Sequence, residues 1–146
     1  MTKRGANYSM IFRMLFTVVF LVLSPLCPQA QNTLELISPL DIPLILSGNF
    51  GEFRGSHFHT GIDIKTQGVE GFPVLAAADG KVDRIKVSPW GYGNTLYIKH
   101  SDGSSTVYAH LQSFSPSIQD WVRGRQYKGR VFSIDLTPTV DFEFHA

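Results

Sequence analysis

The densest chemistry in this sequence lies in one short stretch, where His57, His59 and Asp63 fall within seven residues. Neutral imidazole nitrogen and carboxylate oxygen are ligands that zinc binds at about 2.0–2.2 Å. In a straight strand His59 and Asp63 would share a face but lie about 13 Å apart, too far to bind one ion. A bend at Thr60-Gly61 would bring them together, and glycine permits a bend at low steric cost. The pattern therefore predicts a zinc site that depends on a bend in the backbone.

A plainer interpretation fits the same residues. His57 and His59 would be two surface histidines on one face of a strand, and Asp63 would be a turn carboxylate. His57 shares a strand face with His59, but such neighbours lie about 6.6 Å apart along an ideal strand. We therefore do not assign His57 to the metal.

The composition excludes several classes of protein. The chain has 146 residues, of which 43% are hydrophobic, and 13 Lys and Arg stand against 12 Asp and Glu. Because these charges are scattered singly, no nucleic-acid partner is expected. Apolar residues recur throughout, which argues against disorder. The length fits one compact domain.

The N-terminus has the pattern of a secretory signal. Basic residues that include Arg13 precede an apolar run at 14–23, which is shorter than the roughly 20 residues that a membrane-spanning helix needs. We predict a signal peptide over 1–30, a folded domain over 31–146 without a transmembrane anchor, and export to the periplasm or cell envelope. The single cysteine, Cys27, falls within the signal. A metal site in the mature domain must then use histidine and carboxylate ligands.

Short alternating segments dominate the mature chain and predict a mainly β, antiparallel domain. One short helix is expected from Ser115-Pro116 to about Tyr127. No packing partner is evident for the last ten residues. The expected strands cover 44–53, 74–78, 80–87, 94–100 and 105–110, with a further strand near 131–136.

Asp102-Gly103, between two alternating runs, is a strong signal for a β-hairpin. A two-residue turn there would pair Ile98 with Val107 and Thr95 with His110. This register divides the side chains of the hairpin between a core face and an outward face. The core face would carry Leu96, Ile98, Val107 and Ala109, and the outward face would carry Tyr97, Tyr108 and His110.

Four separated segments together resemble the lysostaphin/LytM-type zinc metallopeptidases of bacterial cell walls. They are Gly48–Glu52, His59–Ile64, Pro73–Val82 and Tyr108–Leu111. The resemblance implies an antiparallel β domain with a groove, and an enzyme that uses Zn²⁺ to cut peptide crosslinks of peptidoglycan. It implies that His59 and Asp63 bind the metal and that His110 acts on the water or the transition state. On this resemblance the domain over 31–146 is peptidase-like, and we assign His57 to the wall of its groove. Tyr97 and Tyr108 are candidates for contacts with substrate, with ordinary cross-strand packing as the alternative.

The sequence departs from that family after His110. Intact members carry a His-x-His motif that supplies the third zinc ligand, and here only His145 follows, in a different residue order. We therefore expect a domain that is incomplete at its C-terminus and impaired as an enzyme in this form. An alternative of a different class is a non-catalytic module that binds the cell wall or activates other wall hydrolases.

Overall fold

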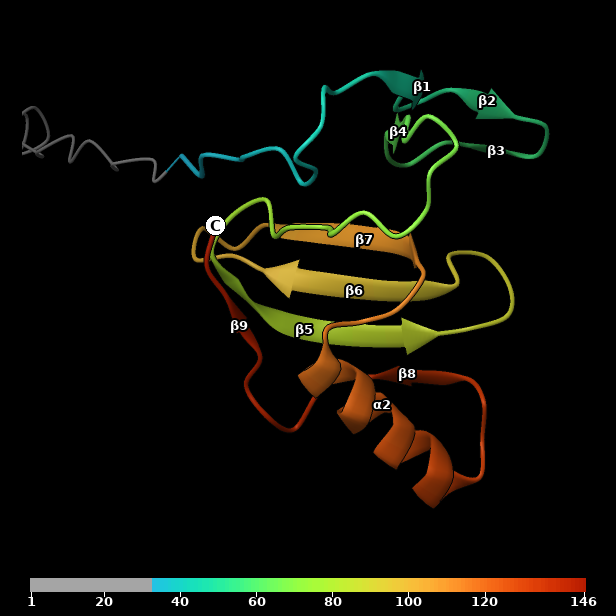
Figure 1. The fold of residues 1–146 in the computed structure, drawn as a ribbon, viewed down its shortest axis with the longest axis vertical. Helices are drawn as coiled ribbons and strands as arrows, with labels where there is room; N and C mark the ends of the chain where they lie inside the picture. The colour runs from blue at the N-terminus through green and yellow to red at the C-terminus, as the bar shows by residue number, and fades with distance from the viewer. Residues whose placement is uncertain (1–32) are drawn as a thin grey trace, which may run out of the picture. The chain divides into compact units, whose positions relative to one another are not determined.

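The computed structural model describes residues 33–146, so the predicted signal peptide lies outside the described residues. The largest element is an antiparallel sheet with strand order β7-β6-β5-β8, in which β9 also pairs with β5 (Figure 1). Its strands are β5 (Gly80–Val87), β6 (Asn94–Lys99), β7 (Ser105–Leu111), β8 (Ile134–Leu136) and β9 (Glu143–Phe144). The prediction of a mainly β, antiparallel domain with one helix is confirmed.

The helix α2 (Pro116–Gly129) contributes buried side chains to the same core as the main sheet. Proline fits its first turn, because the missing N–H would have no partner there, and Arg130 ends it in a left-handed conformation with φ 51°. Ile118 and Val122 lie four residues apart on one face of the helix and are almost fully buried. They pack against a cluster of strand residues that includes Ile85. The sequence therefore predicted the helix and its start, and missed its end by about two residues.

Two small sheets precede the main sheet in the chain. In one, β1 (Leu46–Gly48) pairs with β4 (Asp63–Ile64), and in the other β2 (Phe53–Arg54) pairs with β3 (His57–Phe58). The single strand predicted over 44–53 is wrong, because the chain turns between β1 and β2.

The strand predicted over 74–78 is also wrong, although the alanines of this segment, 76–78, are buried. Its backbone donors find partners outside any strand ladder. The N–H of Leu75 donates to the carbonyl of Pro39 at 2.9 Å, and the N–H of Ala77 donates to the hydroxyl of Tyr108 at 2.7 Å. The segment thus lies against β7 without joining the sheet as a strand.

The β6–β7 hairpin has a different register from the predicted one. Its loop has three residues and is closed by the His100 N–H, which donates to the Ser104 carbonyl at 3.0 Å, while Gly103 takes a φ of 89°. Ile98 consequently pairs with Thr106, one residue from the prediction. Since a slip of one residue turns a strand over, Val107 faces outward at 48% exposure and Tyr108 packs against the core. The predicted placement of both side chains is therefore wrong.

The last ten residues, for which no partner was evident, pack against the main sheet. The Phe142 carbonyl accepts a hydrogen bond from the Val82 N–H at 2.9 Å, and β9 continues this pairing. The ring of Phe142 meets that of Trp121 edge to face at 6.4 Å. The aromatic residues of this segment thus cover apolar surface between β5 and α2.

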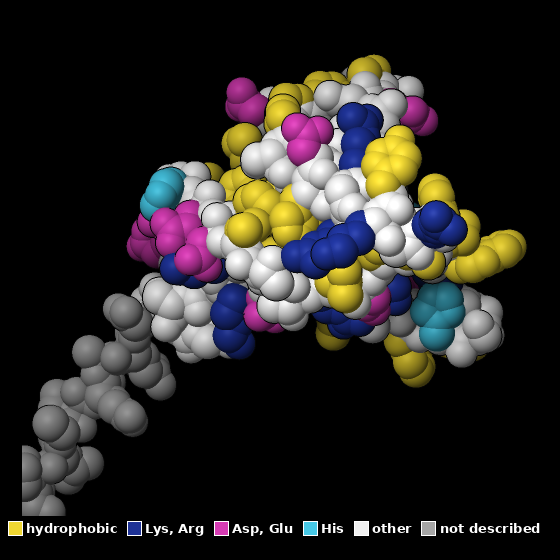
Figure 2. Space-filling model, turned by 90° about the horizontal axis from the view of Figure 1, so that it is seen from below, with side chains coloured by type: hydrophobic (Ala, Val, Ile, Leu, Met, Phe, Trp, Pro, Cys, Tyr) yellow, Lys and Arg dark blue, Asp and Glu magenta, His cyan; other side chains and the backbone are white. Residues whose placement is uncertain are grey.

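The surface mixes apolar and charged side chains. Phe50, Trp90 and Tyr127 are at least 75% exposed. Figure 2 shows hydrophobic side chains on one face among Lys, Arg, Asp and Glu, without a large area of one charge. Over residues 33–146, no helix has the length and hydrophobicity that crossing a bilayer requires.

The observed register makes a testable distinction between two neighbouring strand positions. Ile98→Ala removes a side chain that is 2% exposed and is expected to lower the free energy of unfolding by about 2–5 kcal/mol. Val107→Ala, at an outward position, is expected to lower it by less than about 1 kcal/mol. Urea unfolding of both variants measures the difference, and equal losses would favour the two-residue turn instead.

Candidate functional site

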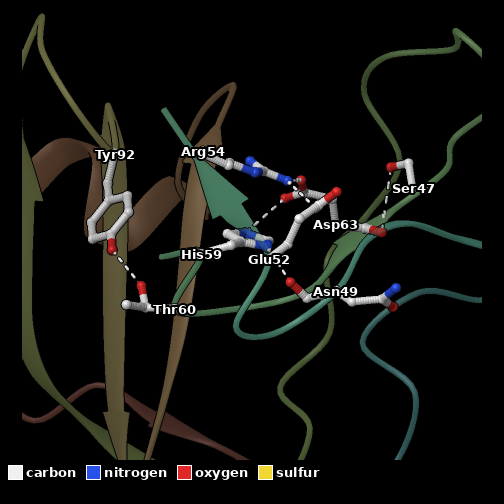
Figure 3. Close-up of polar contacts among 8 residues, drawn as sticks. All are labelled: Ser47, Asn49, Glu52, Arg54, His59, Thr60, Asp63 and Tyr92. Atoms are coloured by element: carbon white, nitrogen blue, oxygen red, sulfur yellow. Dashed lines mark hydrogen bonds and ion pairs between the residues drawn. The ribbon is translucent and has the colours of Figure 1, made fainter. Parts of the chain in front are cut away.

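The predicted bend is present and brings His59 and Asp63 together (Figure 3). Strand β3 ends at Phe58, the chain bends at Gly61, and β4 begins at Asp63. His59 Nε2 lies 3.3 Å from Asp63 Oδ1. Gly61 is not among the glycines with a positive φ, so the bend itself does not require a glycine. The two side chains point at a common position in space.

A backbone carbonyl sets the orientation of the His59 ring. His59 Nδ1 lies 3.0 Å from the carbonyl oxygen of Asn49, and a carbonyl only accepts, so Nδ1 carries the proton. Nε2 then faces Asp63 and is the ring nitrogen available to a metal ion. Backbone hydrogen bonds from His59 N–H to Glu52 O, at 2.7 Å, and from Gly51 N–H to His59 O, at 2.8 Å, hold the same segment. Such a bond on the second ring nitrogen is the usual support of a metal-binding histidine.

Asp63 is held in its charged form by Arg54. The guanidinium pairs with Asp63 Oδ2, and this hydrogen bond is the main reason that the pKa of the Asp63 carboxyl lies below its usual value. The charges of His59 and His110 act in the same direction. A carboxylate must be deprotonated to bind a metal ion. The electrostatics of the cluster therefore suit Asp63 to that role.

The distance between His59 and Asp63 fits zinc. Two ligands on a tetrahedral ion with bonds of about 2.0–2.1 Å lie about 3.3–3.4 Å apart, and the observed separation of Nε2 and Oδ1 is 3.3 Å. These two donors would occupy two positions of such an ion. Within residues 33–146 no group of three or more His, Cys, Asp or Glu side chains is arranged to hold a metal.

His57, the third member of the sequence cluster, has different surroundings. It sits on β3 opposite Arg54, is exposed, and its Nδ1 lies 3.4 Å from the hydroxyl of the neighbouring Ser56. His145 lies near Asp79, with Nδ1 3.8 Å from Oδ2. Neither histidine joins His59 and Asp63 in a group of three potential ligands.

His110 reaches the surface through an irregularity in β7. Leu96 pairs with Tyr108, but Asn94 pairs with Leu111, so β7 has one extra residue opposite Thr95. This β-bulge contains His110, which has a φ of 56°, rare for a residue other than glycine. In a regular strand with the observed register, His110 would face the core. The extra residue of the bulge reverses this, and the side chain of His110 is exposed. The sequence thus predicted an outward His110 from a register that is wrong.

Tyr92, to which the sequence analysis gave no role, connects the His110 and His59 regions. Its ring meets the His110 ring edge to face at 6.3 Å, and its carbonyl accepts a hydrogen bond from the His110 N–H at 2.9 Å. Its hydroxyl lies 2.8 Å from Thr60 Oγ1, in the bend between His59 and Asp63. In the sequence Tyr92 stands between two glycines, at 91–93. Such a pattern predicts a turn and says nothing about a contact with His110 or Thr60.

The two tyrosines predicted to contact substrate lie on opposite faces of the sheet. Tyr108 pairs with Leu96, and the next residue along that strand, Tyr97, points to the other face. Tyr97 pairs with Val107 on the outer face, and the Arg84 guanidinium lies 5.0 Å from its ring centre. The hydroxyl of Tyr108 is part of a half-buried network with Ala77 N–H and Thr106 Oγ1. The structure therefore does not bring these tyrosines together at one groove.

Sequence comparison identifies relatives with named activities. A 75-residue stretch is 45% identical to the DD-carboxypeptidase/endopeptidase Mpg of Neisseria meningitidis, covering 51% of this chain and 16% of that protein. The murein hydrolase activator NlpD of Salmonella dublin is 37% identical over 97 residues, covering 66% and 24%. The cell division protein DipM of Caulobacter vibrioides is 31% identical over 83 residues, covering 57% and 13%. The chain thus spans less than a quarter of the length of these relatives.

No solved structure matches the chain significantly. The sequence model of Peptidase family M23 matches residues 57–146, more than half of the chain. The matched residues include His59, Asp63 and His110. The resemblance to LytM-type enzymes is thereby confirmed. The chain belongs to Peptidase family M23.

Proposed function

We propose that this chain forms part of an exported zinc metalloendopeptidase that cuts peptides of peptidoglycan. The observation that carries the proposal is the His59–Asp63 pair, with Nε2 and Oδ1 3.3 Å apart and Nδ1 bound to the Asn49 carbonyl. Membership of a peptidase family and a relative named endopeptidase support the reaction. A metalloprotease of Haemophilus influenzae among the relatives supports the metal.

Each residue of the site has a part in this proposal. His59 and Asp63 would hold the ion, which supplies a Lewis acid that polarises the scissile carbonyl and makes water nucleophilic near neutral pH. His110 moves a proton or stabilises the charge that develops on the carbonyl oxygen. Its exposed position leaves the imidazole accessible to a bound peptide. Tyr92 fixes the distance between His110 and the bend that carries the ligands.

A second function is favoured by two observations. Within the part of the chain that the structure describes, no third ligand accompanies His59 and Asp63, and the Salmonella dublin relative is named murein hydrolase activator. A non-catalytic module on the same fold would bind its partner without the metal. Measurements of zinc binding and of peptidoglycan hydrolysis distinguish the two functions, because only the peptidase requires both.

The metal ligands can be tested by binding alone. His59→Ala or Asp63→Ala is expected to abolish zinc binding, because each removes one of two adjacent donors. His57→Ala is the matched control, since it removes an exposed histidine on the same hairpin. Equilibrium dialysis against Zn²⁺ measures the affinity. Unchanged binding in both ligand variants would refute the assignment.

His110→Ala is expected to leave zinc affinity unchanged and to reduce hydrolysis of peptidoglycan by about 10²–10⁴-fold, the usual contribution of a positioned acid or base. The assay uses the chain with any residues that its gene encodes beyond Ala146, and release of soluble peptides is followed. His100→Gln is a control at a buried histidine outside the site. Undiminished turnover in His110→Ala would remove this residue from the mechanism.

The contact between Tyr92 and Thr60 predicts coupled effects. Tyr92→Phe keeps the ring against His110 but removes the hydroxyl, and Thr60→Val removes the partner of that hydroxyl. Each variant is expected to lower kcat while zinc affinity stays unchanged. The double variant should lose little more than either single one, because both changes break the same contact. Additive losses would show that the two residues act separately.

A further inference from the structure

The two oxygens of Asp63 have different partners. Oδ1 faces His59 Nε2 at 3.3 Å, whereas Oδ2 is paired with the Arg54 guanidinium (Figure 3). A carboxylate can bind a metal through one oxygen or through both. A guanidinium on Oδ2 directs that oxygen away from a ligand position, so that Oδ1 is the oxygen offered beside His59.

The backbone leaves room for this pair. Gly48 lies opposite Asp63 in the β1–β4 ladder. A Cβ atom at Gly48 would lie 2.6 Å from Asp63 Oδ2 and would also collide with the guanidinium of Arg54. No other residue type could stand there without displacing one of the two side chains. The glycine of β1 is therefore a spatial requirement of the contact between Arg54 and Asp63.

Arg54 also contacts Glu52, through the same nitrogen that pairs with Asp63. Its Nη2 lies 3.5 Å from Oε2 of Glu52, whose backbone carbonyl accepts the His59 N–H. The segment that orients His59 is thus connected to the side chain that orients Asp63. Both side chains of the Arg54–Asp63 pair are about 40% exposed, and exposed ion pairs contribute little to folding stability. The contact is better explained by what it does for Asp63 than by what it adds to the fold.

We propose that Arg54 is the positioning residue of the metal site, which holds Asp63 so that it binds the ion through Oδ1 alone. This inference rests on the proposed function, since it takes Asp63 to be a ligand. Arg54 itself touches neither the ion nor the substrate in this proposal. Its contribution is to the geometry and the charge of the carboxylate, as expected of hydrogen bonds to metal ligands.

The test measures metal affinity without any need for catalysis. Arg54→Met keeps a long side chain but removes the guanidinium, and is expected to weaken Co²⁺ and Zn²⁺ binding by about 10–100-fold, the usual effect of losing such a partner. Arg54→Lys should recover part of the loss, because it restores a charge but not the planar guanidinium. The visible absorption of bound Co²⁺ should change in Arg54→Met, since Oδ2 becomes free to bind.

A matched control is available on the main sheet. Arg84 pairs with Asp135 between β5 and β8, at 2.6 Å, with a similar exposure of both side chains. Arg84→Met is expected to leave both metal affinity and the Co²⁺ spectrum unchanged. If Arg54→Met behaves like Arg84→Met while Asp63→Asn loses the metal, Arg54 has no positioning role. If Asp63→Asn also binds normally, the ligand assignment of the proposed function fails instead.

Discussion

One hydrogen bond, between His59 Nδ1 and the Asn49 carbonyl, determines what the site can do. It fixes the protonated nitrogen and leaves the other nitrogen free beside Asp63. For that bond to form, the chain must turn back between β1 and β2, which places Asn49 against His59. Two backbone hydrogen bonds hold this turn against His59. The His59 N–H donates to the Glu52 carbonyl, and the Gly51 N–H donates to the His59 carbonyl. A charged arginine then completes the arrangement from β2.

The site combines two different kinds of support. The His59 and Asp63 segment is built from short strands and local turns, whereas His110 belongs to a long strand of the main sheet. A bulge with a left-handed backbone at His110 directs its side chain out of an otherwise regular ladder. Bulges and left-handed residues other than glycine cost energy and are retained where a side chain must point in a particular direction. The conformation of His110 therefore supports the role that we propose for it.

Much of the fold was predictable because it depends on local patterns. Alternation predicted β5, β6, β7 and β8 but not β9, and Ser115-Pro116 predicted the start of α2. The hairpin register was wrong because Asp102-Gly103 suits both a two-residue and a three-residue loop, and the choice depends on packing along the whole strand pair. The prediction of a strand at 74–78 was wrong because the hydrogen-bond partners of this segment lie far away in the sequence. The cluster at 57–63 was found from residue types, but Asn49, Arg54 and Tyr92 were not, because a carbonyl, an ion pair and an aromatic contact leave no spacing signal.

No strand of the small sheets pairs with a strand of the main sheet in residues 33–146. The sheets are joined by the connecting segment 65–79 and by side-chain contacts such as that between Thr60 and Tyr92. A change in the length or conformation of the connecting segment would therefore alter where His110 lies relative to His59 and Asp63, while the strand pairing within each sheet stays as it is.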